Sequence, residues 1–289
     1  MNRDNPERSC RRAFLKTAVA AAATLAGTAA SPALAGERGF SQKLLQVWSC
    51  GGLAEAMNPA HALYERQTGV AISYTGAFAA ALGKSLLGSA TTEVFAGRVL
   101  DLAKKLRASG KMEYFKPLCF TSYVLVTPKG NPAGIERIED LARSGVRVVL
   151  APEASPPGGA AAQAILKKAG VLEAAMGNAV TLGTCVQRTM ENVISGKGDA
   201  SIVELRVTRL PAFFGRVDIL PIPEPLFPPP PLTFTIGVMK HAKDRALADN
   251  FLEFMTSDQG QAFFEQAGFI PAISDKGREL VERLGVFDV

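Results

Sequence analysis

The first stretch that could do chemistry is the corner between an apolar segment and a helical pattern, where residues 47–56 are VWSCGGLAEA. Small residues, Ser49-Cys50-Gly51-Gly52, leave the backbone exposed at this corner. A helix that begins there presents unpaired N–H groups and the positive end of its dipole, which suit a negatively charged group. The thiol of Cys50 would instead suit a soft metal ion, so both kinds of solute are considered.

Three cysteines remain beyond the first 35 residues: Cys50, Cys119 and Cys185. Cys50 and Cys185 each precede an expected helix, and Glu204 ends an expected strand. Thiolates and a carboxylate in one cleft could bind Cu(I), Zn(II) or trivalent arsenic. Two of the cysteines could instead form a redox-active pair. A third alternative is plain core packing, because cysteine is often buried and the sequence has no C-x-x-C spacing.

The sequence does not favour an enzyme. His61 and His241 lie away from the corners that could hold a nucleophile, so no Ser or Cys has a histidine base and a positioning acid nearby in the pattern. The glycines follow neither the G-x-G-x-x-G nor the P-loop spacing. We therefore expect no catalytic residue and no cofactor.

The first 35 residues have the features of a signal peptide. Residues 10–16, CRRAFLK, resemble the twin-arginine export motif, and an uncharged, alanine-rich run follows at residues 17–35. Ala33-Leu34-Ala35 supplies an A-x-A cleavage site before Gly36. We expect export to the periplasm by the twin-arginine route, with cleavage after Ala35.

Net charge argues against a nucleic-acid partner. The whole chain has a formal charge of +5, and residues 1–35 contribute +3 from five Lys/Arg and two Asp/Glu, which leaves +2 for residues 36–289. A nucleic-acid-binding surface needs a clustered basic face, which such a nearly neutral chain does not suggest.

Short apolar runs alternate with helical patterns along residues 44–109 and again along 123–205. This βα alternation predicts parallel sheets with helices on both faces. Residues 222–234 hold six prolines within thirteen residues, so they are expected to form an extended connector. We predict an α/β fold with two lobes, each a mainly parallel sheet flanked by helices. The expected division is a signal peptide at 1–35, the first part of lobe 1 at 36–120, lobe 2 with the connector at 121–231, and the return to lobe 1 at 232–289.

Six stretches occur in an order that resembles one known family. They are QVWSCGGLAEAM, TEVFAG, LVTPKGNP, APEASPPGG, VQRTMENVISGKGDASIVE and NFLEFMTSDQGQAFFEQAGFIP, and together they span about 44–272. They resemble the periplasmic molybdate- and tungstate-binding proteins of ABC importers. The resemblance implies the two-lobe periplasmic binding protein type II fold. It also implies a monomer that closes on a small inorganic solute and delivers it to an ABC permease in the inner membrane.

The same resemblance implies a ligand site at strand ends and helix starts of both lobes. In the family, hydroxyls, backbone N–H groups and a tyrosine hold the dehydrated oxyanion. Here Gly52 stands at the position of the first serine, Pro157 at that of an N–H donor, and Glu204 at that of the tyrosine. Arg206 and Arg209 follow the expected Glu204 strand and could reach an anion, but the sequence favours a place at the surface for both. The expected ligand-binding residues are Ser49, Cys50, Gly51, Gly52, Thr75, Gly76, Ala77, Gly158, Cys185, Val186 and Glu204.

The expected solute is a molybdate- or tungstate-like oxyanion. The alternatives are a soft metal or metalloid held by Cys50, Cys185 and Glu204, or a thiol-redox protein. These alternatives differ in what they require of the cavity, because thiols and a carboxylate are less suited to a dianion than hydroxyls are.

Overall fold

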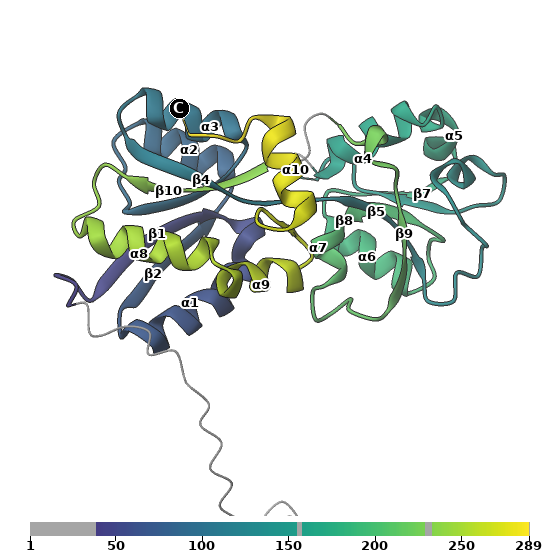
Figure 1. Cartoon of the computed structure of the whole chain (residues 1–289). Coiled ribbons are helices and arrows are strands. Elements are labelled where there is room, and N and C mark those ends of the chain that lie inside the picture. Colours follow the sequence, from purple (N-terminus) through teal and green to yellow (C-terminus); the bar gives the residue numbers. More distant parts are fainter. Residues whose placement is uncertain (1–38, 155–157, 229–232, 289) are drawn as a thin grey trace, which may run out of the picture. The chain divides into compact units, whose positions relative to one another are not determined.

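The computed structural model describes residues 39–154, 158–228 and 233–288. The predicted signal peptide, its cleavage site after Ala35 and part of the polyproline tract lie outside the described residues. Phe40–Val289 form one compact unit, and its architecture is the two-lobe α/β fold that the sequence predicts (Figure 1). Within the described residues, no helix is both long enough and apolar enough to cross a lipid bilayer.

Lobe 1 is built on one six-stranded sheet. Its strands are β1 (Leu44–Cys50), β2 (Ala71–Ala77), β3 (Val94–Arg98), β4 (Met112–Phe120), β10 (Thr233–Met239) and β11 (Ile270–Pro271). They follow the order β11-β4-β10-β3-β1-β2 across the sheet. Strand β1 pairs in parallel with β2 and β3, whereas β10 is antiparallel to β3 and β4.

The lobe 1 sheet is therefore mixed, and the prediction that it is mainly parallel was wrong in this respect. The chain leaves lobe 1 at the end of β4 and returns from lobe 2 as β10. Because β3 ends near lobe 2 and β10 starts there, Phe234 at the start of β10 pairs with Arg98 at the end of β3. A strand that re-enters from the far lobe between β3 and β4 has to run against both neighbours.

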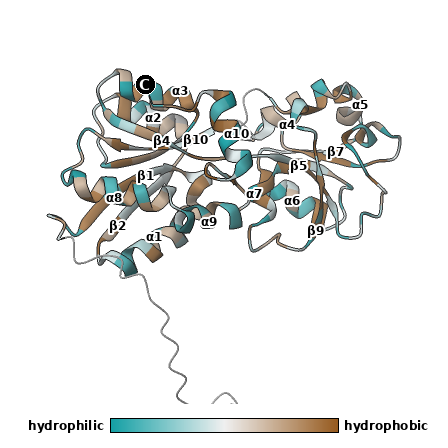
Figure 2. Cartoon of the chain, viewed as in Figure 1, coloured by the Kyte–Doolittle hydropathy of each residue, from teal (hydrophilic) through white to brown (hydrophobic). Residues whose placement is uncertain are grey.

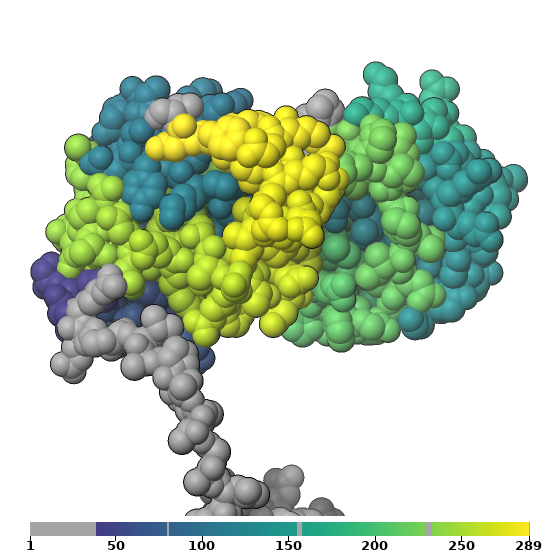
Figure 3. Space-filling view, viewed as in Figure 1, coloured from purple at the N-terminus to yellow at the C-terminus, as the bar shows by residue number. Residues whose placement is uncertain are grey.

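Helices cover both faces of the lobe 1 sheet. In β3, Val94 and Ala96 belong to a core shared with α1 and α8, whereas Phe95 between them packs with α2 and α3. This alternation is the two-residue period of a strand buried on both sides. Figure 2 shows the hydrophobic strands between the helices, and Figure 3 shows the C-terminal helices covering one face of the lobe. The helices are η1 (Gly51–Leu53), α1 (Ala54–Thr68), α2 (Ala79–Leu87), α3 (Leu100–Ala108), α8 (Arg245–Thr256), α9 (Asp258–Gln266) and α10 (Asp275–Leu284).

Lobe 2 has two smaller sheets. β5 (Tyr123–Pro128) lies between β8 (Ser201–Glu204) and β9 (Val217–Pro221) and is antiparallel to both, and β6 (Val148–Leu150) pairs in parallel with β7 (Ala179–Leu182). Tyr123 and Leu125 pack against α4 and face away from Val124 and Val126, which share a core with α6. The helices are η2 (Ile138–Ala142), α4 (Gly158–Lys168), α5 (Leu172–Gly177), α6 (Val186–Ile194), α7 (Leu205–Thr208) and η3 (Glu224–Leu226).

A buried histidine in lobe 1 leads to a prediction about acid stability. His61 of α1 is buried against Tyr74 and Phe251, with ring centroids 5.0 and 5.6 Å away. Burial lowers the pKa of His61 from 6.5 to about 4. The unfolded chain therefore takes up a proton more readily than the folded one. As the pH falls from 6.5 to about 4, the free energy of unfolding should therefore fall by about 3 kcal/mol.

Urea unfolding at a series of pH values tests this expectation. The His61→Phe variant should lose most of the decline between pH 6.5 and about 4, whereas replacing the exposed His241 by asparagine should leave the profile unchanged. A wild-type profile that is flat over this interval would contradict the account.

Candidate functional site

A cavity of about 1000 Å³ lies between the two lobes. Its walls are formed by the carboxyl ends of β1, β2, β3 and β8 and by the helix starts that follow them, which is where open α/β sheets place their ligands. The lining residues of lobe 1 are 50–52, 76–79 and 98, and those of lobe 2 are 154, 158, 184–187, 202–204, 206, 207 and 210.

Most of the sequence-predicted ligand residues lie in this wall. They are Cys50, Gly51, Gly52, Gly76, Ala77, Gly158, Cys185, Val186 and Glu204. Ser49 and Thr75 are not among the lining residues. The Ser49 side chain is fully buried, 2.6 Å from the Tyr74 hydroxyl, and it donates to the carbonyl of Cys50, while Thr75 is exposed on β2. The hydroxyls expected from the family therefore do not face this cavity, and Pro157 lies outside the described residues.

Among the described residues, three helices of nine or more residues begin at the cavity wall: α2 in lobe 1, and α4 and α6 in lobe 2. The short helices η1 and α7 begin there as well. Phe78 and Cys185, the N-cap residues of α2 and α6, make no side-chain cap. The starts of α4 and α6 adjoin, since a Cβ built on Gly158 would lie 3.5 Å from Cγ2 of Val186. Backbone N–H groups at such helix starts have no intrahelical partner, so they can donate to a solute.

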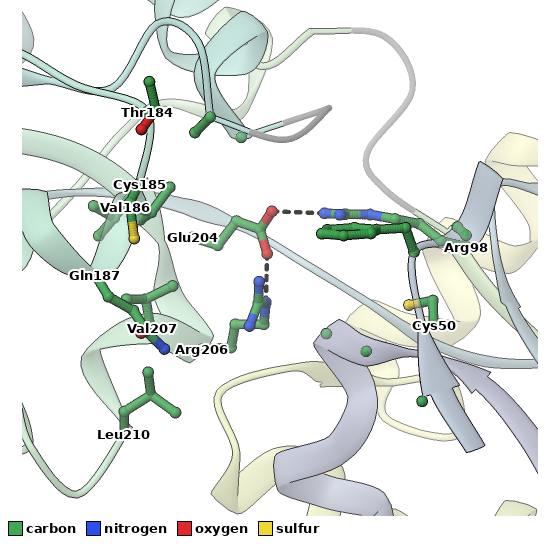
Figure 4. A pocket seen from close by; sticks show the side chains of 18 of the residues that line it. Cys50, Arg98, Thr184, Cys185, Val186, Gln187, Glu204, Arg206, Val207 and Leu210 are labelled. Carbon is green, nitrogen blue, oxygen red and sulfur yellow. Dashed lines mark hydrogen bonds and ion pairs between the residues drawn. The ribbon is translucent and has the colours of Figure 1, made fainter. Parts of the chain in front are cut away.

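A buried carboxylate lies between two arginines in the cavity wall (Figure 4). Arg98 Nη2 donates to Glu204 Oε1 at 2.6 Å, and Arg206 Nε donates to Glu204 Oε2 at 2.5 Å. The Glu204 side chain is 5% exposed, and those of Arg98 and Arg206 are 12% and 19% exposed. Arg98 comes from lobe 1 and Glu204 from lobe 2, so this ion pair joins the lobes across the cavity.

The two guanidinium groups keep Glu204 ionised. Burial alone would raise the pKa of the Glu204 carboxyl, but attraction and hydrogen bonds from Arg206 and Arg98 outweigh burial and lower it. Burial alone would lower the pKa of Arg206, because it disfavours the charged form. The attraction and hydrogen bond of Glu204 outweigh burial and raise that pKa. The three side chains together place two positive charges and one negative charge in the wall.

Local geometry explains the positions of both arginines. Arg98 is the last residue of β3, and Val99 after it has a φ of 78°, which is strained for a β-branched residue and costs about 1–3 kcal/mol. The guanidinium carbon of Arg206 lies 3.5 Å from the point where a side chain on Gly52 would begin. This is an ordinary contact distance, so Arg206 packs directly over the position where the family has its first serine.

Neither arginine was among the ligand-binding residues predicted from the sequence. Arg98 was not considered. Arg206 was considered as a residue that could reach an anion, but the favoured surface position was wrong, because its partner Glu204 holds it in the wall. One signal could have found them: Arg98 is the last residue of a strand and Arg206 comes two residues after the end of another, close to the predicted residues in the pattern.

The cysteines do not form a metal or redox centre in this arrangement. Cys50, Cys119 and Cys185 are all free thiols, the first two buried and the third exposed. Burial raises the pKa of Cys50, which opposes thiolate formation. Figure 4 shows Cys50 and Cys185 on opposite sides of Glu204. Across the described ranges, no three side chains of the His, Cys, Asp and Glu types are grouped to hold a metal ion.

Comparisons with known proteins identify the family. Residues 45–270 match the family model of bacterial extracellular solute-binding proteins, and the chain belongs to this family. It is 26% identical over 215 residues to the molybdate-binding protein ModA of Mycobacterium bovis, covering 70% of this chain and 74% of that protein. Members of the family are transport proteins that bind small solutes outside the cytoplasm and work with a membrane permease.

Solved structures share the fold. The substrate-binding domain of a proposed molybdenum ABC transporter from Clostridium difficile superposes with a TM-score of 0.69 at 20% identity, covering 79% of this chain and 98% of that one. The periplasmic molybdate-binding protein of Azotobacter vinelandii gives a TM-score of 0.62 at 20% identity, covering 78% and 98%. These neighbours are type II periplasmic binding proteins, the fold class that the sequence predicts.

Proposed function

We propose that this solute-binding protein of an ABC importer binds a small tetrahedral oxyanion, the chemical class that includes molybdate and tungstate. The observation that supports the proposal best is that the starts of α2, α4 and α6 and two arginines line one cavity. Helix N-termini and guanidinium groups both donate hydrogen bonds and favour negative charge. The names of the relatives point to the same class of solute.

In this proposal the arginines donate the hydrogen bonds that hydroxyls donate in the molybdate- and tungstate-binding family that the sequence resembles. Arg98 approaches the solute from lobe 1 and Arg206 from lobe 2, while the N–H groups at the start of α6 donate from a third direction. A guanidinium can bind two oxygens of a tetrahedral anion at once, which compensates for the absence of a hydroxyl at Gly52. The cavity is larger than one such anion, so we expect the lobes to close on it.

Further proposals on export, oligomeric state and lobe boundaries rest on the sequence. We propose export by the twin-arginine route with cleavage after Ala35, and action as a monomer. We also propose that the chain passes from lobe 1 to lobe 2 at about residue 120, where β4 ends, and returns to lobe 1 at about residue 232, where β10 begins.

Calorimetry and thermal unfolding test the solute class. Molybdate, tungstate, sulfate, phosphate and arsenate are added separately to the ligand-free protein, with Cu(I), Zn(II) and arsenite as metal and metalloid probes. We expect at least one oxyanion to stabilise the fold, by about 2.7 kcal/mol at a concentration 100 times its Kd. The effect should persist in Cys50→Ser and Cys185→Ser variants. A response to metals alone that disappears in these variants would contradict the proposal.

A further inference from the structure

Glu204 is an unexpected group in a site for anions. Its carboxylate lines the cavity, is buried and is held by Arg98 and Arg206, each through one hydrogen bond to a different oxygen. An anionic solute that reaches the two arginines therefore also contacts a fixed negative charge.

The remaining hydrogen-bonding capacity of Glu204 constrains that solute. An ionised carboxylate only accepts hydrogen bonds, and its two oxygens offer about four lone-pair positions. The arginines occupy one position on each oxygen. A solute oxygen placed against Glu204 must bring a proton, because two acceptor-only oxygens in contact leave buried charges unpaired.

Donors for the other oxygens of the solute are present beside Glu204. The Nε of Arg98 is buried and has no hydrogen-bond partner among the described residues. The starts of α4 and α6 adjoin on the lobe 2 side of the cavity. The wall thus combines several donors with one obligate acceptor.

We infer that Glu204 makes the site select an oxyanion that keeps a proton at neutral pH, such as hydrogen phosphate or hydrogen arsenate, over fully ionised molybdate, tungstate and sulfate. This inference rests on the proposed function and names a subset of its solute class. A hydrogen phosphate donates its proton to Glu204 and accepts from the arginines and helix starts. A molybdate or sulfate dianion accepts the same hydrogen bonds but meets Glu204 without a proton between them.

Isothermal titration of the purified, ligand-free protein with phosphate, arsenate, sulfate and molybdate tests the inference. In the wild type, phosphate and arsenate should bind at least about tenfold more tightly than sulfate and molybdate. In Glu204→Gln the amide can donate to an unprotonated oxyanion, so the phosphate-to-sulfate affinity ratio should fall by about 10- to 100-fold. Because this ratio is measured within one variant, a general loss of folded protein does not change it.

Glu55→Gln is the matched control. Glu55 lies 4.0 Å from Arg206 but does not line the cavity, so its replacement removes a nearby charge without removing the acceptor. The affinity ratio should stay at the wild-type value.

The outcomes separate this inference from the proposed function. Sulfate or molybdate binding as tightly as phosphate, or a ratio unchanged in Glu204→Gln, would overturn the inference while the oxyanion site stands. Absence of binding by all four anions would overturn both.

Discussion

Replacing Arg98 by methionine is expected to weaken oxyanion binding by about 100-fold. Methionine keeps an unbranched side chain but removes the only lining cation that lobe 1 contributes within the described residues, together with the buried Nε donor. It also removes the ion pair to Glu204 that joins the lobes. Calorimetric Kd values for the oxyanion that binds the wild type most tightly would measure the loss.

Arg147→Met is the control for this variant. Arg147 forms an equally short ion pair, 2.6 Å to Asp199, but lies in lobe 2 outside the cavity. Its replacement should change oxyanion affinity by less than about twofold, because a residue that is distant from the cavity and shares no partner with it acts independently of the solute. An Arg98→Met protein that binds as tightly as the wild type would show that Arg98 does not contact the solute.

Replacing Glu204 by leucine is expected to lower the free energy of unfolding by about 3–5 kcal/mol. The substitution removes the carboxylate between two mostly buried guanidinium groups. Arg98 then loses its ion-pair partner, and Arg206 keeps only the more distant Glu55, at 4.0 Å. Urea denaturation in a buffer free of phosphate and sulfate would measure the loss. Added phosphate should recover part of it, because an anion bound between the arginines replaces the missing carboxylate.

Glu224→Leu provides the comparison for stability. Glu224 also contacts two cations, Lys276 and Arg283, but all three side chains are partly exposed. Exposed ion pairs contribute about 1 kcal/mol or less, so this variant should be affected far less. Equal losses in the two variants would contradict the view that the buried position of Glu204 is decisive.

The local architecture of the cavity could be predicted from the sequence. The apolar runs that end at Cys50 and Glu204, and the helical patterns that follow, place the ends of β1 and β8 at the cavity. Gly158 and Val186 were predicted as helix starts, and the family resemblance placed them at the ligand. Such signals are local, since they depend on periodicity and on residues at a helix start.

Long-range pairing could not be predicted in this way. Strand β4 contains Lys116 and Pro117 in its interior, which obscure its alternation, and its place in the sheet depends on β10 more than one hundred residues later. The antiparallel position of β10 follows from the return of the chain out of lobe 2. Nothing within TFTIGVM itself specifies the direction of its neighbours.

The electrostatics of the site required the structure for the same reason. An arginine after a strand is usually solvated, and only the approach of Glu204, 106 residues away in sequence, places Arg98 in the cavity wall. Gly52 was interpreted as the loss of a hydroxyl. In the structure the guanidinium of Arg206 lies over Gly52, so a cation from the other lobe stands where the family has a neutral donor.

Anomalous diffraction from crystals grown with arsenate would show whether the cavity between the lobes binds an oxyanion through Arg98, Arg206 and the start of α6. We expect one strong arsenic peak within hydrogen-bonding reach of both guanidinium groups and the Val186 N–H, with an arsenate oxygen against Glu204. An arsenic peak elsewhere in the molecule with an empty cavity, or no peak at all, would contradict it.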